Sequence, residues 1–138
     1  MTASGYTIKK LAIIGVGLIG GSLAIALREA GKVGYIIGCG RDKANLEKAV
    51  ELGVIDDFSH DVAEAVTDAD LVFVSVPLGA MKVVFENMKG HLKPDAIVTD
   101  GGSAKACVIQ DWIDVFGIIG NVSHECIQRF TQRIHFFR

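Results

Sequence analysis

The sequence has few cysteines, no excess of basic residues and no unbroken apolar run long enough to cross a membrane. Its three cysteines, Cys39, Cys107 and Cys126, are odd in number and widely spaced, which fits neither a disulfide framework nor a zinc site. The longest apolar stretch, residues 11–27, is interrupted by glycines and a serine, so we predict a strand, a turn and a helix there. We therefore expect no metal site and no membrane contact.

The balance of charge also excludes some partners. Lysine and arginine number 14, aspartate and glutamate number 16, and the formal net charge is -2. This mixture provides no basic stripe that would follow a phosphate backbone, so we expect no nucleic-acid partner. Residues 1–7 lack the charged segment and small-residue cleavage site of a signal peptide, and we expect a cytoplasmic protein.

Apolar runs of strand length alternate with longer stretches of helical period, which is typical of βαβ units on a parallel sheet. The predicted fold is α/β, a Rossmann-type doubly wound and mostly parallel sheet, with the dinucleotide-binding domain at residues 1–117 and an atypical tail at 118–138. The expected strands are residues 10–14, 35–39, 71–76 and 96–99, and the expected helices are 18–30, 43–52, 80–88 and 104–115.

A glycine fingerprint, Gly-x-Gly-x-x-Gly, lies between the first expected strand and helix, where a dinucleotide site requires it. In this fingerprint Gly15 permits the tight turn, Gly17 lets the backbone approach a pyrophosphate, and Gly20 lets the helix pack on the strand. The helix then begins at Leu18 and Ile19, whose amides point at the phosphates. We predict that this loop binds NAD or NADP.

The end of the second expected strand bears on the choice between these cofactors. An NAD site usually has a carboxylate there for the ribose 2′-hydroxyl, whereas an arginine accommodates a 2′-phosphate. Here Arg41 favours NADP, and Asp42, one residue further, favours NAD if it reaches the ribose. Asp42 also fits a plain helix cap, so the alternatives stay open, with NADP preferred.

Six segments taken together resemble the prephenate and arogenate dehydrogenases of tyrosine biosynthesis, and the resemblance extends over about residues 9–115. The most particular are Gly-Val-Ile-Asp at residues 53–56 and Thr-Asp-Gly-Gly-Ser-Ala-Lys at residues 99–105. The six segments are residues 15–23, 38–42, 51–56, 68–72, 75–77 and 99–105.

The resemblance implies an oxidoreductase that performs an oxidative decarboxylation on prephenate or arogenate. In this reaction NAD(P)+ takes a hydride from the ring carbon that bears the hydroxyl, carbon dioxide leaves and the ring becomes aromatic. The protein places the nicotinamide against that carbon and polarises the hydroxyl.

The resemblance also implies roles for individual residues. Ser75, Val76 and Pro77 would line the cofactor, Ser103 would lie near the nicotinamide and the substrate hydroxyl, and His124 would accept the hydroxyl proton. The alternatives are structural: Pro77 only ends a strand, Ser103 only caps the following helix, and His124 is a solvated histidine on a polar turn.

Two features depart from the family pattern. The residues around His124 do not match the family's Gly-His-Pro-x-Ala-Gly motif, and we expect the chain to lack the helical C-terminal domain of the family. We expect residues 118–138 to be a truncated or frame-shifted tail. Lys105, Arg129 and Arg133 would then be the cations near the two carboxylates of the substrate.

The C-terminal region also predicts self-association, and two alternative functions stay open. Without the helical domain, apolar residues of the C-terminal region would be uncovered and would favour a homo-oligomer. These are Phe116, Ile118, Ile119, Phe130, Phe136 and Phe137. One alternative function is a module that binds the dinucleotide without turnover, and the other is a different Rossmann oxidoreductase.

Overall fold

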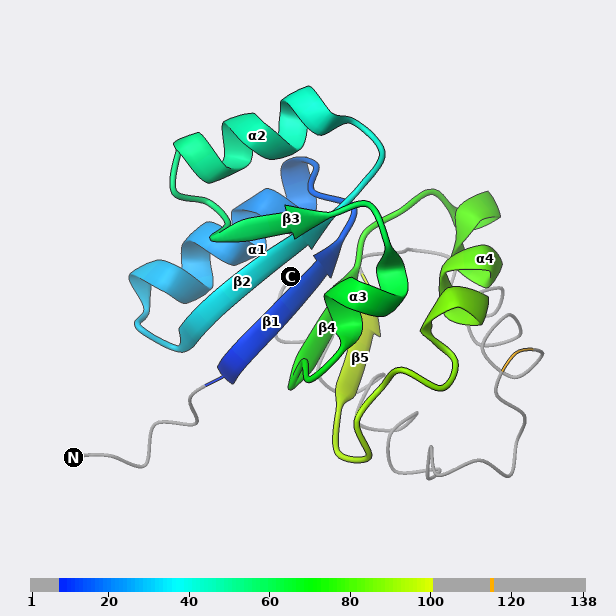
Figure 1. The fold of residues 1–138 in the computed structure, drawn as a ribbon. Helices are drawn as coiled ribbons and strands as arrows, with labels where there is room; N and C mark the ends of the chain where they lie inside the picture. The colour runs from blue at the N-terminus through cyan, green and yellow to red at the C-terminus, as the bar shows by residue number, and fades with distance from the viewer. Residues whose placement is uncertain (1–7, 101–114, 116–138) are drawn as a thin grey trace.

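The computed structural model describes residues 8–100 and Val115. In this part of the chain five strands alternate with four helices (Figure 1). The strands are β1 Ile8–Ile14, β2 Val33–Cys39, β3 Asp57–Ser59, β4 Leu71–Val74 and β5 Ile97–Asp100. The helices are α1 Leu18–Glu29, α2 Lys43–Glu51, α3 Val62–Val66 and α4 Leu78–Met88.

The strands form one sheet in the order β3-β2-β1-β4-β5, and every described pair is parallel. The central strand β1 pairs with β2 on one side and with β4 on the other, so that Ile14 lies between Cys39 and Val74. The carboxyl ends of these three strands therefore meet at one edge. The predicted α/β, Rossmann-type fold is confirmed.

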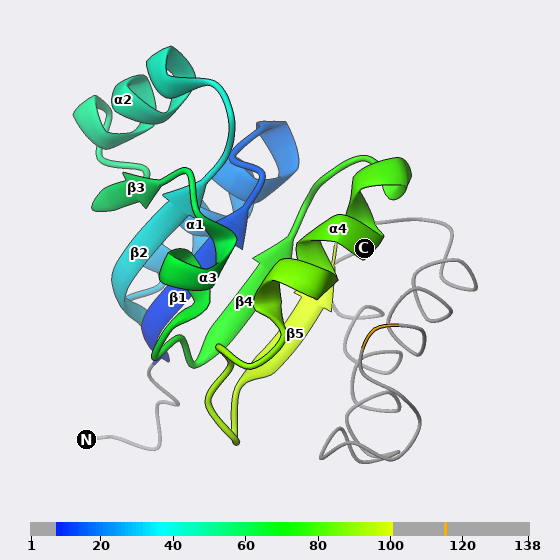
Figure 2. The same ribbon diagram turned by 45° about the vertical axis from the view of Figure 1, so that its right-hand side comes forward.

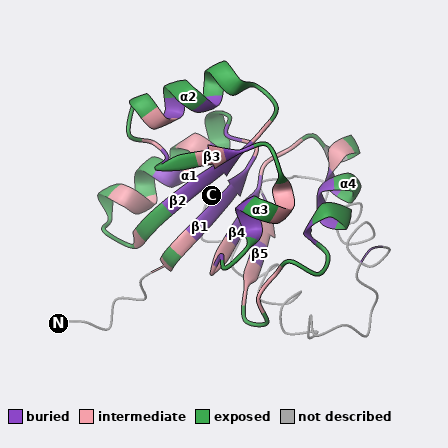
Figure 3. Ribbon diagram, viewed as in Figure 1, coloured by how far each residue is buried: buried purple, intermediate pink, exposed green. Residues whose placement is uncertain are grey.

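Each face of the sheet has its own apolar core, because side chains alternate along a strand. On β1, Leu11 and Ile13 pack with residues of α1 and α2, whereas Ala12 and Ile14 pack with residues of α3 and α4. Figures 1 and 2 show these two helix pairs on opposite faces of the sheet. In Figure 3 the inner strands are the most continuously buried elements, as expected for strands covered on both sides.

The observed elements differ from the predicted ones in a few places. The strand and helix between residues 57 and 66 were not predicted, so the strand expected third is the fourth. This strand, β4, ends at Val74, two residues before its predicted end at residue 76. The chain turns there into the loop that leads to α4, whose N-cap residue is Pro77. The predicted helix 104–115, apart from Val115, and the predicted tail 118–138 lie outside the described residues.

Among the described residues, no helix is both long and apolar enough to cross a membrane.

Candidate functional site

The loops after β1 and β4 lie side by side at the carboxyl edge of the sheet. The chain leaves β1 toward β2 on one side, while β4 and β5 lie on the other, and open α/β sheets bind ligands at such a switch point. The Ser75 amide donates to the Ile14 carbonyl at 2.7 Å, and the Gly15 amide donates to the Cys39 carbonyl at 2.8 Å. These hydrogen bonds join the ends of three strands.

Two glycines of the loop are required by the packing of the protein itself. Gly15 has a φ of +95°, and a Cβ there would lie 2.2 Å from the carbonyl oxygen of Ser75. At Gly20, a Cβ would lie 2.7 Å from the carbonyl oxygen of Gly15 and 2.9 Å from the Ile13 side chain. The first glycine therefore permits the turn, and the third permits close contact between α1 and β1.

The middle glycine is different, because a Cβ on Gly17 would meet nothing within 4 Å. Gly17 is the N-cap residue of α1, its position has no side-chain cap, and the first turn contains no acidic residue. The amides of that turn are therefore free of a competing side chain, and the helix dipole favours an anion there. The space and the donors both fit a phosphate group.

Leu18 and Ile19, the first residues of α1, are large apolar side chains in contact with solvent. Leu18 is 88% exposed and Ile19 is 56% exposed. They directly follow the open position at Gly17, so that a ligand bound to the loop would cover apolar surface as well as contact amides. The five residues predicted for the glycine loop are thus brought together at one helix start.

The sequence analysis missed Asn45, which connects the glycine loop to the adjacent helix. The side-chain Nδ2 of Asn45, on α2, donates to the carbonyl oxygen of Val16 at 2.7 Å. The backbone amide of the same residue donates to Asp42 at 3.2 Å. Asn45 lies 29 residues from Val16, so no local pattern indicates this contact.

The turn after β2 consists of Gly40, Arg41 and Asp42. Asp42 accepts the hydrogen bond from Asn45 as the N-cap of α2, so its predicted structural alternative is confirmed. Arg41 is exposed. Gly40 follows the strand directly, and a Cβ there would meet only ordinary contacts, the nearest 3.6 Å away on Leu46. The backbone at Gly40 would therefore accept a larger residue.

The β4–α4 loop supplies the other predicted cofactor residues. Ser75 and Val76 are half-buried and Pro77 is exposed, all at the same edge as the glycine loop. Pro77 also precedes the first residue of α4, so it both ends the loop and begins the helix. Asp100, the last residue of β5, is buried next to the end of β4.

The predicted catalytic residues Ser103 and His124 lie outside the described residues, as do Lys105, Arg129 and Arg133. The described part of the chain contains no group of three histidine, cysteine, aspartate or glutamate residues that could hold a metal ion. Cys39 is a free, buried thiol. Burial raises the pKa of Cys39 to about 11, with smaller contributions from Asp61 and Glu64, so it is an unreactive core residue.

The Gly-Val-Ile-Asp segment, singled out in the sequence, has a structural role. The Asp56 carboxylate accepts hydrogen bonds from the Ile36 amide of β2 at 2.8 Å and from the Arg28 guanidinium of α1 at 3.0 Å. Partial burial opposes ionisation, but the two hydrogen bonds outweigh it and hold the pKa of Asp56 below its usual range. Asp56 thus connects α1 to the β2–β3 side of the sheet.

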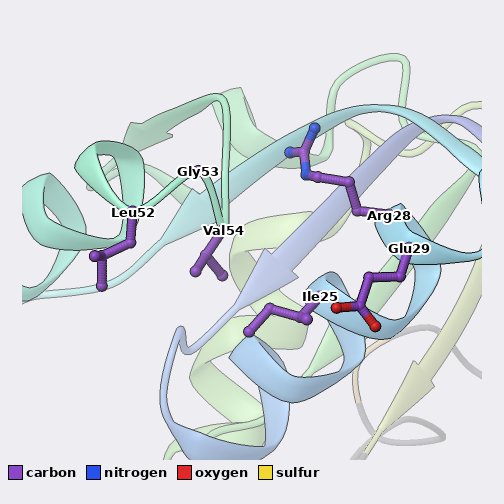
Figure 4. A pocket seen from close by; sticks show the side chains of 6 residues that line it. All are labelled: Ile25, Arg28, Glu29, Leu52, Gly53 and Val54. Carbon is purple, nitrogen blue, oxygen red and sulfur yellow. The ribbon is translucent and has the colours of Figure 1, made fainter.

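A hollow of about 500 Å³ lies between the last turn of α1 and the residues after α2 (Figure 4). It is at the opposite end of α1 from the glycine loop, and its walls are mainly apolar. The lining residues are Ile25, Arg28, Glu29, Leu52, Gly53 and Val54. This hollow is therefore separate from the candidate phosphate site.

Comparisons with known proteins all indicate the same family. The profile of the family described as "Prephenate dehydrogenase, nucleotide-binding domain" matches residues 23–122. Cyclohexadienyl dehydrogenase of Zymomonas mobilis is 37% identical over 102 residues, which cover 74% of this chain and 35% of that protein. Prephenate dehydrogenase of Bacillus subtilis is 32% identical over 103 residues, covering 74% of this chain and 28% of that protein. The chain thus spans about a third of the length of these relatives.

Solved structures agree with these sequence matches. Prephenate dehydrogenase from A. aeolicus in complex with hydroxyphenyl propionate and NAD+ superposes with a TM-score of 0.72 at 32% identity. The superposition covers 80% of this chain and 39% of that chain. Synechocystis arogenate dehydrogenase superposes with a TM-score of 0.70 at 34% identity, covering 78% of this chain and 37% of that one.

Proposed function

This chain belongs to the prephenate dehydrogenase family through its nucleotide-binding domain, and on that premise we propose that it acts in the NAD(P)-dependent oxidative decarboxylation of prephenate or arogenate. Its described part would bind the dinucleotide. The observation that supports this best is the glycine loop, in which the two outer glycines are required by packing and the middle one leaves open space. That open space lies at the start of a helix whose first turn has no side-chain cap.

The strand end after β2 supports NADP over NAD. A carboxylate directly after the strand would favour the ribose 2′-hydroxyl, but Gly40 has no side chain there although the backbone would accept one. Asp42 caps α2 through one carboxylate oxygen, whereas Arg41 is exposed and able to pair with a 2′-phosphate. The A. aeolicus enzyme was crystallised with NAD+, so the preference proposed here rests on this chain's own residues.

The remaining roles follow the family resemblance. The bound cofactor would accept a hydride from the substrate ring. Ser75, Val76 and Pro77 would line the cofactor beyond β4, and Ser103 would lie near the nicotinamide and the substrate hydroxyl. His124 would take the hydroxyl proton as the general base.

An alternative function is dinucleotide binding without turnover. The neighbours of His124 favour it, because Ser123, Glu125 and Ile127 stand where the family's motif has glycine, proline and alanine. Cofactor titration does not separate the two functions, since both require the same glycine loop.

An assay of turnover separates them. The purified chain is mixed with prephenate and then with arogenate, each with NADP+ and with NAD+, and the absorbance of the reduced nicotinamide is followed. The proposal expects turnover with one of the substrates and a lower KM for NADP+ than for NAD+, with His124→Ala as the inactive control. Cofactor binding without any turnover would overturn the enzymatic proposal and support the alternative.

A further inference from the structure

His60 is a residue outside every motif of the sequence, yet it contacts the turn that follows β2. In the sheet register Cys39 pairs with Ser59, so Gly40 and His60 are the next residues along two neighbouring strands. The Nδ1 atom of His60 lies 2.7 Å from the carbonyl oxygen of Gly40. A carbonyl only accepts hydrogen bonds, so Nδ1 carries the hydrogen and donates it.

The backbone on both sides of His60 is held in place, although the imidazole itself is exposed. The hydroxyl of Ser59 accepts from the Asp61 amide at 3.0 Å and donates to Glu64 at 3.0 Å. Asp61 in turn caps α3 by accepting from the Ala63 amide at 3.1 Å. An imidazole on such a fixed loop loses little additional freedom when it bonds to Gly40.

The hydrogen bond between His60 and Gly40 restricts the backbone on the N-terminal side of Arg41. Gly40 has no side chain that would restrict its own backbone, and glycine has more conformational freedom than other residues. Its carbonyl is held by His60, while Asp42 is held by its cap to Asn45. Arg41 therefore lies between two fixed residues, in the turn that is proposed to contact the 2′-phosphate of the cofactor.

We infer that His60 is a positioning residue for cofactor choice: by holding the Gly40 carbonyl, it orients Arg41 toward the 2′-phosphate of NADP. This inference rests on the proposed NADP preference and goes beyond it by assigning a second residue to that preference. His60 acts through Arg41 and not by its own contact with the phosphate. Its loss should therefore weaken NADP binding and leave NAD binding nearly unchanged.

The test compares dissociation constants for NADP+ and NAD+, measured by calorimetric titration of the full chain. For His60→Ala we expect the Kd for NADP+ to rise about tenfold, the effect of about one lost hydrogen bond, and the Kd for NAD+ to change less than twofold. His60→Asn, whose amide can donate from the Nδ1 position, should restore most of the NADP+ affinity. Exposed His91 lies after α4, and His91→Ala is the matched control with no expected effect.

A double variant tests the route through Arg41. If His60 acts through Arg41, His60→Ala should add no further loss of NADP+ affinity to Arg41→Ala. Equal weakening of both dinucleotides, additive losses in the double variant, or failure of His60→Asn to restore affinity would each overturn the inference. If the unsubstituted chain binds neither dinucleotide, the proposed function fails and the inference with it. If the chain binds both and His60→Ala leaves their ratio unchanged, only the inference fails.

Discussion

At the scale of single residues, the glycine loop separates positions that serve folding from the position proposed to bind the dinucleotide. A methyl group at Gly20 would overlap the Gly15 carbonyl and the Ile13 side chain, so Gly20→Ala should lower the free energy of unfolding by about 1–3 kcal/mol through overpacking.

A methyl group at Gly17, in contrast, would contact no other residue of the described protein. Gly17→Ala should keep stability within about 0.5 kcal/mol but raise the dinucleotide Kd at least about tenfold. Urea unfolding and cofactor titration measure both effects.

The helix itself offers a matched control for these two variants. Gly21 is the next residue of α1, and a Cβ there meets only Val54 at 4.0 Å. Gly21→Ala should leave the Kd unchanged and, because alanine favours helix over glycine, raise stability by up to about 1 kcal/mol. A Gly17→Ala chain that binds the dinucleotide normally would show that the open space at Gly17 is not a phosphate site.

Residues in the site were predictable to the extent that their role depends on nearby sequence. Gly15, Gly17 and Gly20 follow a fixed spacing between a strand and a helix, so the pattern alone located them. Asn45 and His60 act through contacts with Val16 and Gly40, 29 and 20 residues away. Such contacts exist only after the sheet has formed, and no period or spacing indicates them.

At the scale of elements, prediction depended on how much apolar surface each element buries. Residues 11–14 of β1 and nearly all of β4 are buried and form continuous apolar runs, which the sequence analysis found. β3 has three residues, Asp57, Phe58 and Ser59, and lies at the edge of the sheet. An edge strand needs no apolar run, and α3 is only five residues long, so neither had a detectable period.

The connection between α1 and the β2–β3 side of the sheet predicts a dependence of stability on pH. The pKa of Asp56 is lower in the folded chain than in the unfolded chain, so its contribution is present above the unfolded pKa of about 3.9 and is lost as pH falls through the folded pKa. Asp56→Asn should lower the free energy of unfolding at neutral pH by about 1 kcal/mol, after allowance for solvent screening. The variant should also lose less stability on acidification.

Urea unfolding at a series of pH values between about 3 and 7 measures this contribution. Glu51→Gln removes one negative charge at the exposed end of α2 and serves as the control for the change in net charge. The control should keep the acid dependence of the unsubstituted chain. Identical pH profiles for Asp56→Asn and the unsubstituted chain would contradict the assigned role of Asp56.

At the scale of the whole molecule, the fold follows from alternation along β1. Because successive side chains of β1 face opposite cores, helices are needed on both faces, and the chain must cross from one side of β1 to the other between β3 and β4. That crossing brings Gly15 and Ser75 together, and it leaves the start of α1 open at the same edge. The location of the candidate site is thus a consequence of how the two cores are covered.

The same arrangement predicts which half of the cofactor stabilises the described domain. The start of α1 and the turn after β2 would bind the pyrophosphate and the adenosine ribose, so 2′-phospho-ADP-ribose should raise the Tm nearly as much as NADP+. At a ligand concentration of 100 times the Kd, the gain in stability is about 2.7 kcal/mol, and a chain of this size shifts by roughly 3 °C per kcal/mol. Nicotinamide mononucleotide, which lacks the adenosine half, should shift the Tm by less than about 1 °C at the same molar concentration.

Thermal unfolding followed by circular dichroism measures the shift with each of the three ligands. Gly17→Ala is the control chain, in which the weaker binding should reduce the shift with NADP+ by about half or more. A larger shift with nicotinamide mononucleotide than with 2′-phospho-ADP-ribose would mean that the nicotinamide half provides most of the binding energy, contrary to the arrangement of the described residues.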